Sequence, residues 1–148
     1  MNAKTSQNSV LKTWVEESTH NYKDGQYITK VFNCPGARYF TVEFDARCAT
    51  ERQYDYLEFT DSAGTRTKYD NQVDTELWPL RVDFQGSKLN FLFRSDQSNN
   101  DWGYKFVVCI QLYCAVPIVG HDHGGISRNA LFVGNGQGCS QLFNRPSF

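Results

Sequence analysis

The feature that most constrains the fold is a series of short segments in which apolar and polar residues alternate. The clearest is residues 38–44, where Phe40, Val42 and Phe44 occupy every second position, because a period of two places these side chains on one face of a β-strand. Further strands are predicted at residues 27–32, 54–59, 65–69, 80–84, 89–94 and 104–112. No segment carries the apolar stripe of a full-length helix. Short strands joined by turns therefore predict an all-β fold, an antiparallel sandwich or barrel.

The chain divides into three zones. Residues 21–112 hold nearly all of the periodic pattern and are predicted to form the domain. Residues 1–20 are predicted to be a poorly ordered leader. Residues 113–148 are rich in glycine and lack a sustained period, so they are predicted to be a disordered tail outside the domain.

Charge and composition exclude several classes of protein. The 15 Lys and Arg residues balance 16 Asp and Glu residues, whereas nucleic-acid binding needs a basic surplus. No apolar run is long enough to span a membrane. The chain shows no secretory signal and no Asn-x-Ser/Thr acceptor, and its five cysteines are scattered. An intracellular protein with reduced thiols is therefore predicted, with Cys34, Cys48 and Cys109 as small core residues.

Acidic residues occur where two predicted strands meet their loops. Asp55 stands at the start of one strand, with Glu51 before it, and Asp96 follows the apolar run 89–93. Because the loops of a sandwich gather at its ends, these acids could face one pocket. Calcium binds six to eight oxygens at about 2.3–2.6 Å, and a carbonyl near Ser98 or the amide of Asn99 would add to the three carboxylates. The alternative is a solvated loop with unconnected acids.

Three ordered motifs within this region resemble a CUB domain. They are TERQYDYLEF at 50–59, LNFLFRSDQS at 89–98 and WGYKF at 102–106. The segment from Phe32 to Ala37 and the Trp78-Pro79 pair are similar to the CUB-like type found inside ZZ-type zinc finger and EF-hand proteins and giant HECT-type ubiquitin ligases. The resemblance covers residues 21–112 and implies a jelly-roll-like β-sandwich.

The resemblance also implies a metal site and a mode of binding. In calcium-binding CUB domains a Glu, the Asp of the YD pair, the Asp of the SD pair and a nearby backbone carbonyl hold Ca²⁺, and here these are Glu51, Asp55, Asp96 and the carbonyl of Ser98. The family's Glu lies further upstream, so Asp45 could replace Glu51. Gln53 precedes the YD pair where secreted members have a cysteine, which agrees with a reduced setting.

We therefore expect a non-catalytic protein-interaction module. Its calcium-ordered end loops would bind a Lys or Arg side chain of a partner protein, with Tyr54 and Asn99 beside the contact and Trp102 near the ion loop. The alternative is a carbohydrate-binding sandwich that uses Trp78 or Trp102 as an exposed stacking face.

The sequence favours neither a zinc site nor an enzymatic function. The spacing of His121 and His123 relative to the cysteines fits no closed zinc module. An enzyme is not expected, because His20 and these two histidines lie outside the β zone and no Ser/His/Asp set converges.

Overall fold

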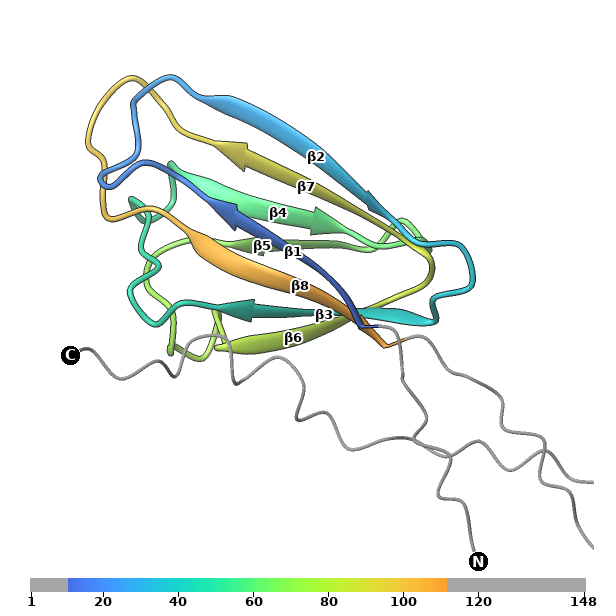
Figure 1. Cartoon of the computed structure of the whole chain (residues 1–148). Coiled ribbons are helices and arrows are strands. Elements are labelled where there is room, and N and C mark those ends of the chain that lie inside the picture. Colours follow the sequence, from blue (N-terminus) through green and yellow to red (C-terminus); the bar gives the residue numbers. More distant parts are fainter. Residues whose placement is uncertain (1–10, 112–148) are drawn as a thin grey trace, which may run out of the picture.

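The computed structural model describes residues 11–111, which form a sandwich of two four-stranded antiparallel sheets (Figure 1). In sheet order, the first contains β1 (Leu11–Glu17), β8 (Lys105–Gln111), β3 (Tyr39–Phe44) and β6 (Arg81–Gln85). The second contains β2 (Tyr27–Asn33), β7 (Lys88–Arg94), β4 (Tyr56–Thr60) and β5 (Arg66–Tyr69). The predicted all-β antiparallel sandwich is confirmed. Within these residues no helix could cross a membrane.

The first strand lies where a leader was predicted. β1 pairs with β8 along its whole length, from Leu11 opposite Gln111 to Glu17 opposite Lys105. Trp14 packs against the core, but the alternation of apolar and polar residues does not continue from it along the strand. Glu16, two positions along, forms an ion pair with Lys30 of β2 instead. The domain therefore includes residues 11–17, while residues 1–10 and the predicted tail lie outside the described part.

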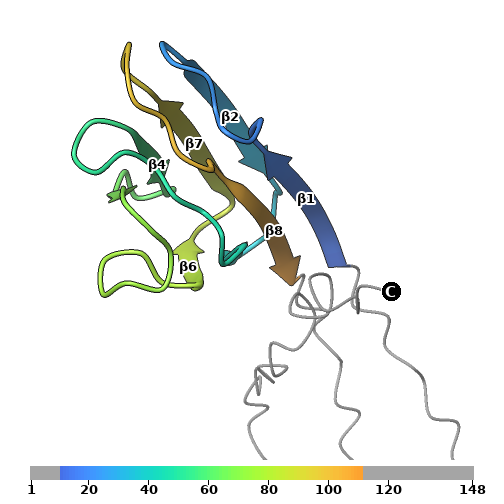
Figure 2. The ribbon, with the colours of Figure 1, turned by 90° about the vertical axis from the view of Figure 1, so that its left-hand side faces the viewer.

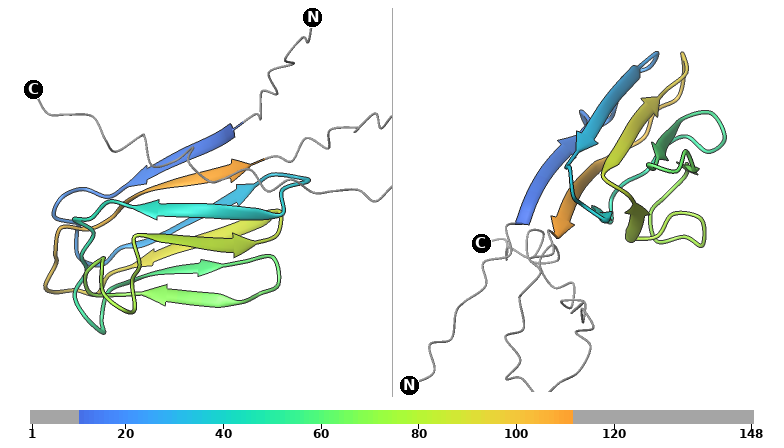
Figure 3. Two further views of the ribbon diagram at one scale, coloured as in Figure 1. Left: turned by 90° about the horizontal axis from the view of Figure 1, so that it is seen from below. Right: turned by 90° about the vertical axis from the view of Figure 1, so that its right-hand side faces the viewer.

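Aromatic rings fill the space between the two sheets. Figures 2 and 3 show the backbone of the two sheets from further directions. Phe106 lies at the centre, with its ring centroid 5.0 Å from that of Phe91, 5.4 Å from that of Phe59 and 5.9 Å from that of Phe44. Phe40, Val42 and Phe44, which the alternation places on one face, are all buried, as are Leu57, Phe91, Phe93 and Phe106 on the other strands. The period-two pattern therefore assigned the inward faces correctly.

The longer connections gather at one end of the sandwich, on the left in Figure 1, and we call this the long-loop end. They are residues 18–26, 45–55, 70–80 and 95–104. Gly103 joins two of these segments, since its backbone pairs with Ala49 in an isolated bridge. A Cβ at Gly103, which has a φ of +102°, would lie 2.1 Å from the hydroxyl of Ser18. Glycine is therefore required where these loops approach closely.

The cysteines only partly match the predicted reduced state. Cys34 and Cys48 are free and buried, as expected of small core residues, and burial raises the pKa of the Cys48 thiol to about 12. Cys109 is also buried and forms a small cluster with Val107 apart from the main core. It is disulfide-bonded, so the prediction of a reduced thiol is wrong at Cys109.

Glu43 is a buried acid on the outer face of the first sheet, opposite Val107 and Arg81 in the strand register. The residue is 7% exposed. Its Oε1 accepts no hydrogen bond within the described residues and lies 3.8 Å from the nearest guanidinium nitrogen of Arg81. Desolvation raises the pKa of the Glu43 carboxyl. Ionised Glu43 therefore opposes folding, and this penalty grows as the pH rises through its folded-state pKa.

We expect Glu43→Gln to increase the free energy of unfolding by about 1 kcal/mol at pH 7, because the amide removes a buried charge. The gain should vanish at about pH 4, where the wild-type carboxyl is protonated in both states. Urea unfolding at the two pH values measures both effects. Glu76→Gln, at an exposed position, is the matched control and should change little. A loss of stability at pH 7 contradicts this account.

Candidate metal site

Three carboxylates from two distant segments meet at the long-loop end. Glu51 and Asp55 lie on the segment between β3 and β4, and Asp96 follows β7. One oxygen of each lies within 4.8 Å of the others. The structure therefore brings together the three acids that the sequence placed at strand ends. Such a group is held apart by charge repulsion unless a cation or hydrogen bonds compensate it.

Asp55 is fully buried and is fixed by two hydrogen bonds. Its Oδ2 accepts one from the Tyr22 hydroxyl at 2.6 Å, and its Oδ1 accepts one from the Asp96 backbone N–H at 2.7 Å. Burial, together with this bond to Asp55, raises the pKa of Tyr22, so the hydroxyl stays a donor. The Asp96 bond directly links the two segments of the site. No pattern in the sequence points to a role for Tyr22 in this site.

Glu51 presents an oxygen that has no hydrogen-bond partner among residues 11–111. Its Oε1 accepts a hydrogen bond from the Asn99 amide at 3.1 Å, and its backbone N–H donates to the Tyr22 hydroxyl at 3.0 Å. Its Oε2 is buried and receives no hydrogen bond within the described residues. Because buried carboxylate oxygens are costly when unpaired, this atom is suited to a hard cation that prefers oxygen ligands.

Asp96 and the residues after it form a tight loop beside the other acids. The Asp96 Oδ1 accepts a hydrogen bond from the Ser98 backbone N–H at 2.9 Å, and the Asp96 carbonyl accepts one from the Gly25 N–H. Asn99 adopts a positive φ of 57°, a conformation that asparagine tolerates well. The loop thereby keeps Ser98 and the Asn99 amide near the carboxylates.

Asp45, the alternative third acid, lies outside this group. Its Oδ1 accepts from the Arg47 Nε at 2.9 Å and its Oδ2 from the guanidinium at 2.8 Å. These bonds hold the pKa of the Asp45 carboxyl below its usual range. The geometry therefore favours Glu51 over Asp45. Tyr54, directly before Asp55, is 60% exposed and is free to reach a partner.

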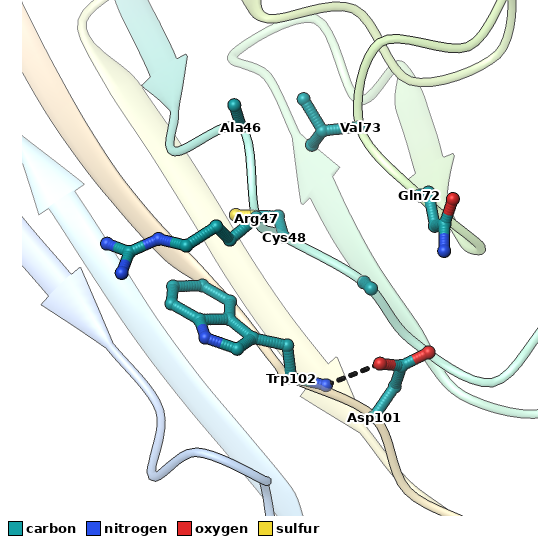
Figure 4. Close-up of a pocket in the computed structure, with 8 residues that line it drawn as sticks. Ala46, Arg47, Cys48, Gln72, Val73, Asp101 and Trp102 are labelled. Carbon is teal, nitrogen blue, oxygen red and sulfur yellow. Dashed lines mark hydrogen bonds between the residues drawn. The ribbon is translucent and has the colours of Figure 1, made fainter.

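Neither of the two tryptophans considered as stacking faces has an open ring face. Trp78 is 0% exposed, so it does not form the exposed platform that the carbohydrate-binding alternative requires. Trp102 packs between the His20 ring, 3.8 Å from its own ring centroid, and the Arg47 guanidinium, 4.7 Å away on the indole. An edge of Trp102 lines a cavity of about 330 Å³ together with Asp101, Arg47 and Gln72 (Figure 4).

CUB domains of known structure share this fold. The CUB1-EGF-CUB2 region of human MASP-1/3 matches 68% of this chain and 42% of its own, with a TM-score of 0.57 and 18% sequence identity. The MASP-1 CUB2 domain bound to Ca²⁺ matches 66% of this chain and 90% of its own, with a TM-score of 0.56 and 16% identity. The described residues therefore form a CUB-like β-sandwich.

Sequence relatives identify the type of CUB-like domain. The chain is 60% identical over 100 residues to the mouse zinc finger ZZ-type and EF-hand domain-containing protein 1, covering 67% of this chain and 3% of that protein. It is 33% identical over 106 residues to the human E3 ubiquitin-protein ligase HERC2, covering 72% of this chain and 2% of that protein. No protein-family model matches. The chain thus carries a CUB-like domain similar to one in these proteins, and it spans a few per cent of their length.

Proposed function

We propose that this domain is a non-catalytic protein-interaction module whose long-loop end binds Ca²⁺ and then captures a Lys or Arg side chain of a partner. The observation that carries the proposal is the convergence of Glu51, Asp55 and Asp96, with the buried Glu51 Oε2 unpaired among the described residues. The Ca²⁺-bound MASP-1 domain of the same fold supports calcium as the cation.

The ligand set fits the chemistry of calcium. Glu51, Asp55 and Asp96 supply three carboxylates, and the carbonyl of Ser98 and water supply neutral oxygens. Three carboxylates around a divalent cation leave one net negative charge, which favours a cationic side chain at the rim. Tyr54 and Asn99 would border this contact. Trp102, which packs against the Arg47 guanidinium, would help to fix the loop 95–104.

No observation favours the carbohydrate-binding alternative, since Trp78 is buried and both faces of Trp102 are covered. The intracellular setting stays a prediction: the free thiols of Cys34 and Cys48 agree with it, whereas the disulfide bond of Cys109 does not. The activities of the much longer relatives are not part of this proposal.

Calcium should raise the stability of the domain. Because the three acids converge only in the folded state, calcium at a hundred times its Kd should add about 2.7 kcal/mol to the free energy of unfolding. The measurement is the melting temperature during a calcium titration that starts from EGTA. Magnesium at equal concentration is the ionic-strength control. An unchanged melting temperature at millimolar calcium contradicts the proposal.

The partner step is tested separately with immobilised peptides. Lysine- and arginine-containing peptides should retain the domain in calcium and release it in EGTA. The same peptides with acetylated lysine or with citrulline are the matched controls, because they keep the shape but lose the charge. Equal retention of charged and neutral peptides contradicts the capture of a basic side chain.

A further inference from the structure

The outward side of the second sheet carries every second residue of β2, β7, β4 and β5 (Figure 1). In β7 the side chains of Leu89, Phe91 and Phe93 are buried in the core, so the residues between them point away from it, because side chains alternate along a strand. Antiparallel pairing aligns the outward residues of all four strands in rows across the sheet. Neighbouring rows are close enough for their side chains to contact a common ligand.

The first row, next to the long-loop end, combines aromatic rings with positive charge. Arg94 of β7 stands between Tyr27 of β2 and Tyr56 of β4 in the register. Tyr27 is 72% exposed, and Arg94 is also exposed. The Lys68 Nζ of β5 lies 3.8 Å from the centroid of the Tyr56 ring. Two cationic side chains are therefore neighbours of the Tyr56 ring.

An apolar strip runs along the β2 side of the same surface. Leu92 of β7 occupies the second row, diagonally between Tyr27 in the first row and Val31 in the third. Val31 is 54% exposed, and diagonal neighbours in a sheet lie about 7–8 Å apart, so these three side chains form one apolar strip. Lys68 and Arg66 of β5 stand at the far ends of the second and third rows. The surface thus has an apolar side and a basic side.

The charges on this surface are almost all of one sign. Arg66, Lys68, Lys88 and Arg94 are exposed on its strands, where Glu58 is the one outward acidic residue. Among the described residues, none of these four basic side chains forms an ion pair. Residues 11–111 carry more acidic than basic side chains overall, so the positive surplus is local. We call this surface the basic face, and its unpaired cations create a positive potential.

We propose that the basic face binds an acidic segment of a partner protein. The carboxylates of the segment pair with Arg94, Lys68 and Arg66 along one side, and its apolar side chains pack on the apolar strip along the other. Charge complementarity of this kind accelerates binding and selects the partner. The inference goes beyond the proposed function and does not rest on it, because the basic face contains none of the three carboxylates.

The sequence and the distribution of charge favour a short acidic segment of another protein. Residues 1–10 and 112–148 contain a single acidic residue, Asp122, so the rest of this chain cannot supply several carboxylates. A long polyanion or an anionic vesicle would also meet the acidic residues elsewhere on the domain, which repel it. A short acidic peptide contacts the basic face alone.

The first test measures the binding of a fluorescein-labelled peptide, DELDELDE, to the whole chain by fluorescence anisotropy in EGTA. The peptide should bind saturably, and raising the salt from 50 to 300 mM should weaken its binding about tenfold. NQLNQLNQ is the matched control, because it keeps the shape and loses the charge, and it should not bind. DESDESDE, which lacks the leucines, should bind about fivefold more weakly than DELDELDE. Absence of binding by DELDELDE at millimolar concentration overturns the inference.

Variants of exposed residues locate the peptide on the domain. Arg94→Gln and Lys68→Gln should each weaken the binding of DELDELDE about threefold, and the double variant about tenfold. Lys12→Gln is the matched control, since it removes one exposed charge from β1 of the other sheet, and it should leave the affinity unchanged. Equal affinity of the wild type and the double variant overturns the assignment of the basic face.

Amide shifts in ¹H–¹⁵N NMR spectra check the location without any substitution. DELDELDE should shift the amide signals of Leu92 and Arg94 and leave that of Val107, on the other sheet, unchanged. The reverse pattern overturns the inference. Phosphatidylserine vesicles and single-stranded oligothymidine test the other anionic occupants, and tighter binding of either one than of DELDELDE overturns the choice of an acidic protein segment. A dimer that dissociates in the Arg94→Gln variant, measured by sedimentation equilibrium, assigns the basic face to a second copy of this chain and also overturns that choice.

Discussion

Replacing Asp55 with alanine should abolish calcium-dependent stabilisation completely and also destabilise the calcium-free domain by about 3 kcal/mol. The second effect arises because Asp55 is fully buried and accepts from both the Tyr22 hydroxyl and the Asp96 N–H. Truncation leaves these two donors without an acceptor in a buried position. Urea unfolding in EGTA and in saturating calcium measures the two effects separately.

Two further variants make the Asp55 prediction sharper. Asp55→Asn keeps one acceptor oxygen and the shape of the side chain, so it should retain more of the basal stability while still losing the calcium response. Asp24→Asn removes an exposed charge at the same end of the domain, outside the three-carboxylate group, and should leave the calcium response intact. A calcium response in Asp55→Ala equal to that of the wild type contradicts the assignment of the site.

Phe106→Ala should lower the free energy of unfolding by about 4 kcal/mol. The ring is 0% exposed, and the rings of both sheets meet on it, including Phe91 of β7 and Phe44 of β3. Removing it leaves a cavity that neighbouring rings cannot refill without leaving their rotamers. Urea unfolding in EGTA gives this value without any contribution from calcium.

Two comparisons give the Phe106 prediction its scale. Phe106→Leu keeps most of the volume and should cost about 1.5 kcal/mol. Tyr27→Ala removes a ring that is 72% exposed on the edge strand β2 and should change stability by about 0.5 kcal/mol at most. If Phe106→Ala lowers the free energy of unfolding less than Phe106→Leu does, the ring does not have a central role in the core.

Sequence patterning predicted most of the fold because a sandwich leaves one face of each strand in the core. The alternation of buried and more exposed residues in β4 and β7 follows directly from this. β1 escaped prediction because its inward positions include Glu16, which is paired with Lys30 at the edge of the sandwich. A charged residue at an inward position removes one of the apolar residues by which such a strand is recognised.

The acidic site was predictable in part for a similar reason. Asp55 and Asp96 adjoin strands whose ends meet, so their convergence follows from the sandwich itself. The choice between Glu51 and Asp45 depends on the guanidinium of Arg47, which occupies Asp45. Tyr22 lies 33 positions before the carboxylate that it contacts, and such a pairing carries no local pattern. Only the three-dimensional fold brings these two side chains together.

The register of β1 on β8 places Leu11 directly opposite Gln111, at the end of the sandwich away from the carboxylates (Figure 1). The first and last residues of the described domain are therefore neighbours in space. Domains with neighbouring termini can be inserted into other proteins with little disturbance to the host. Residues 11–111 could therefore be inserted into a surface loop of a carrier protein, which would point the long-loop end outward.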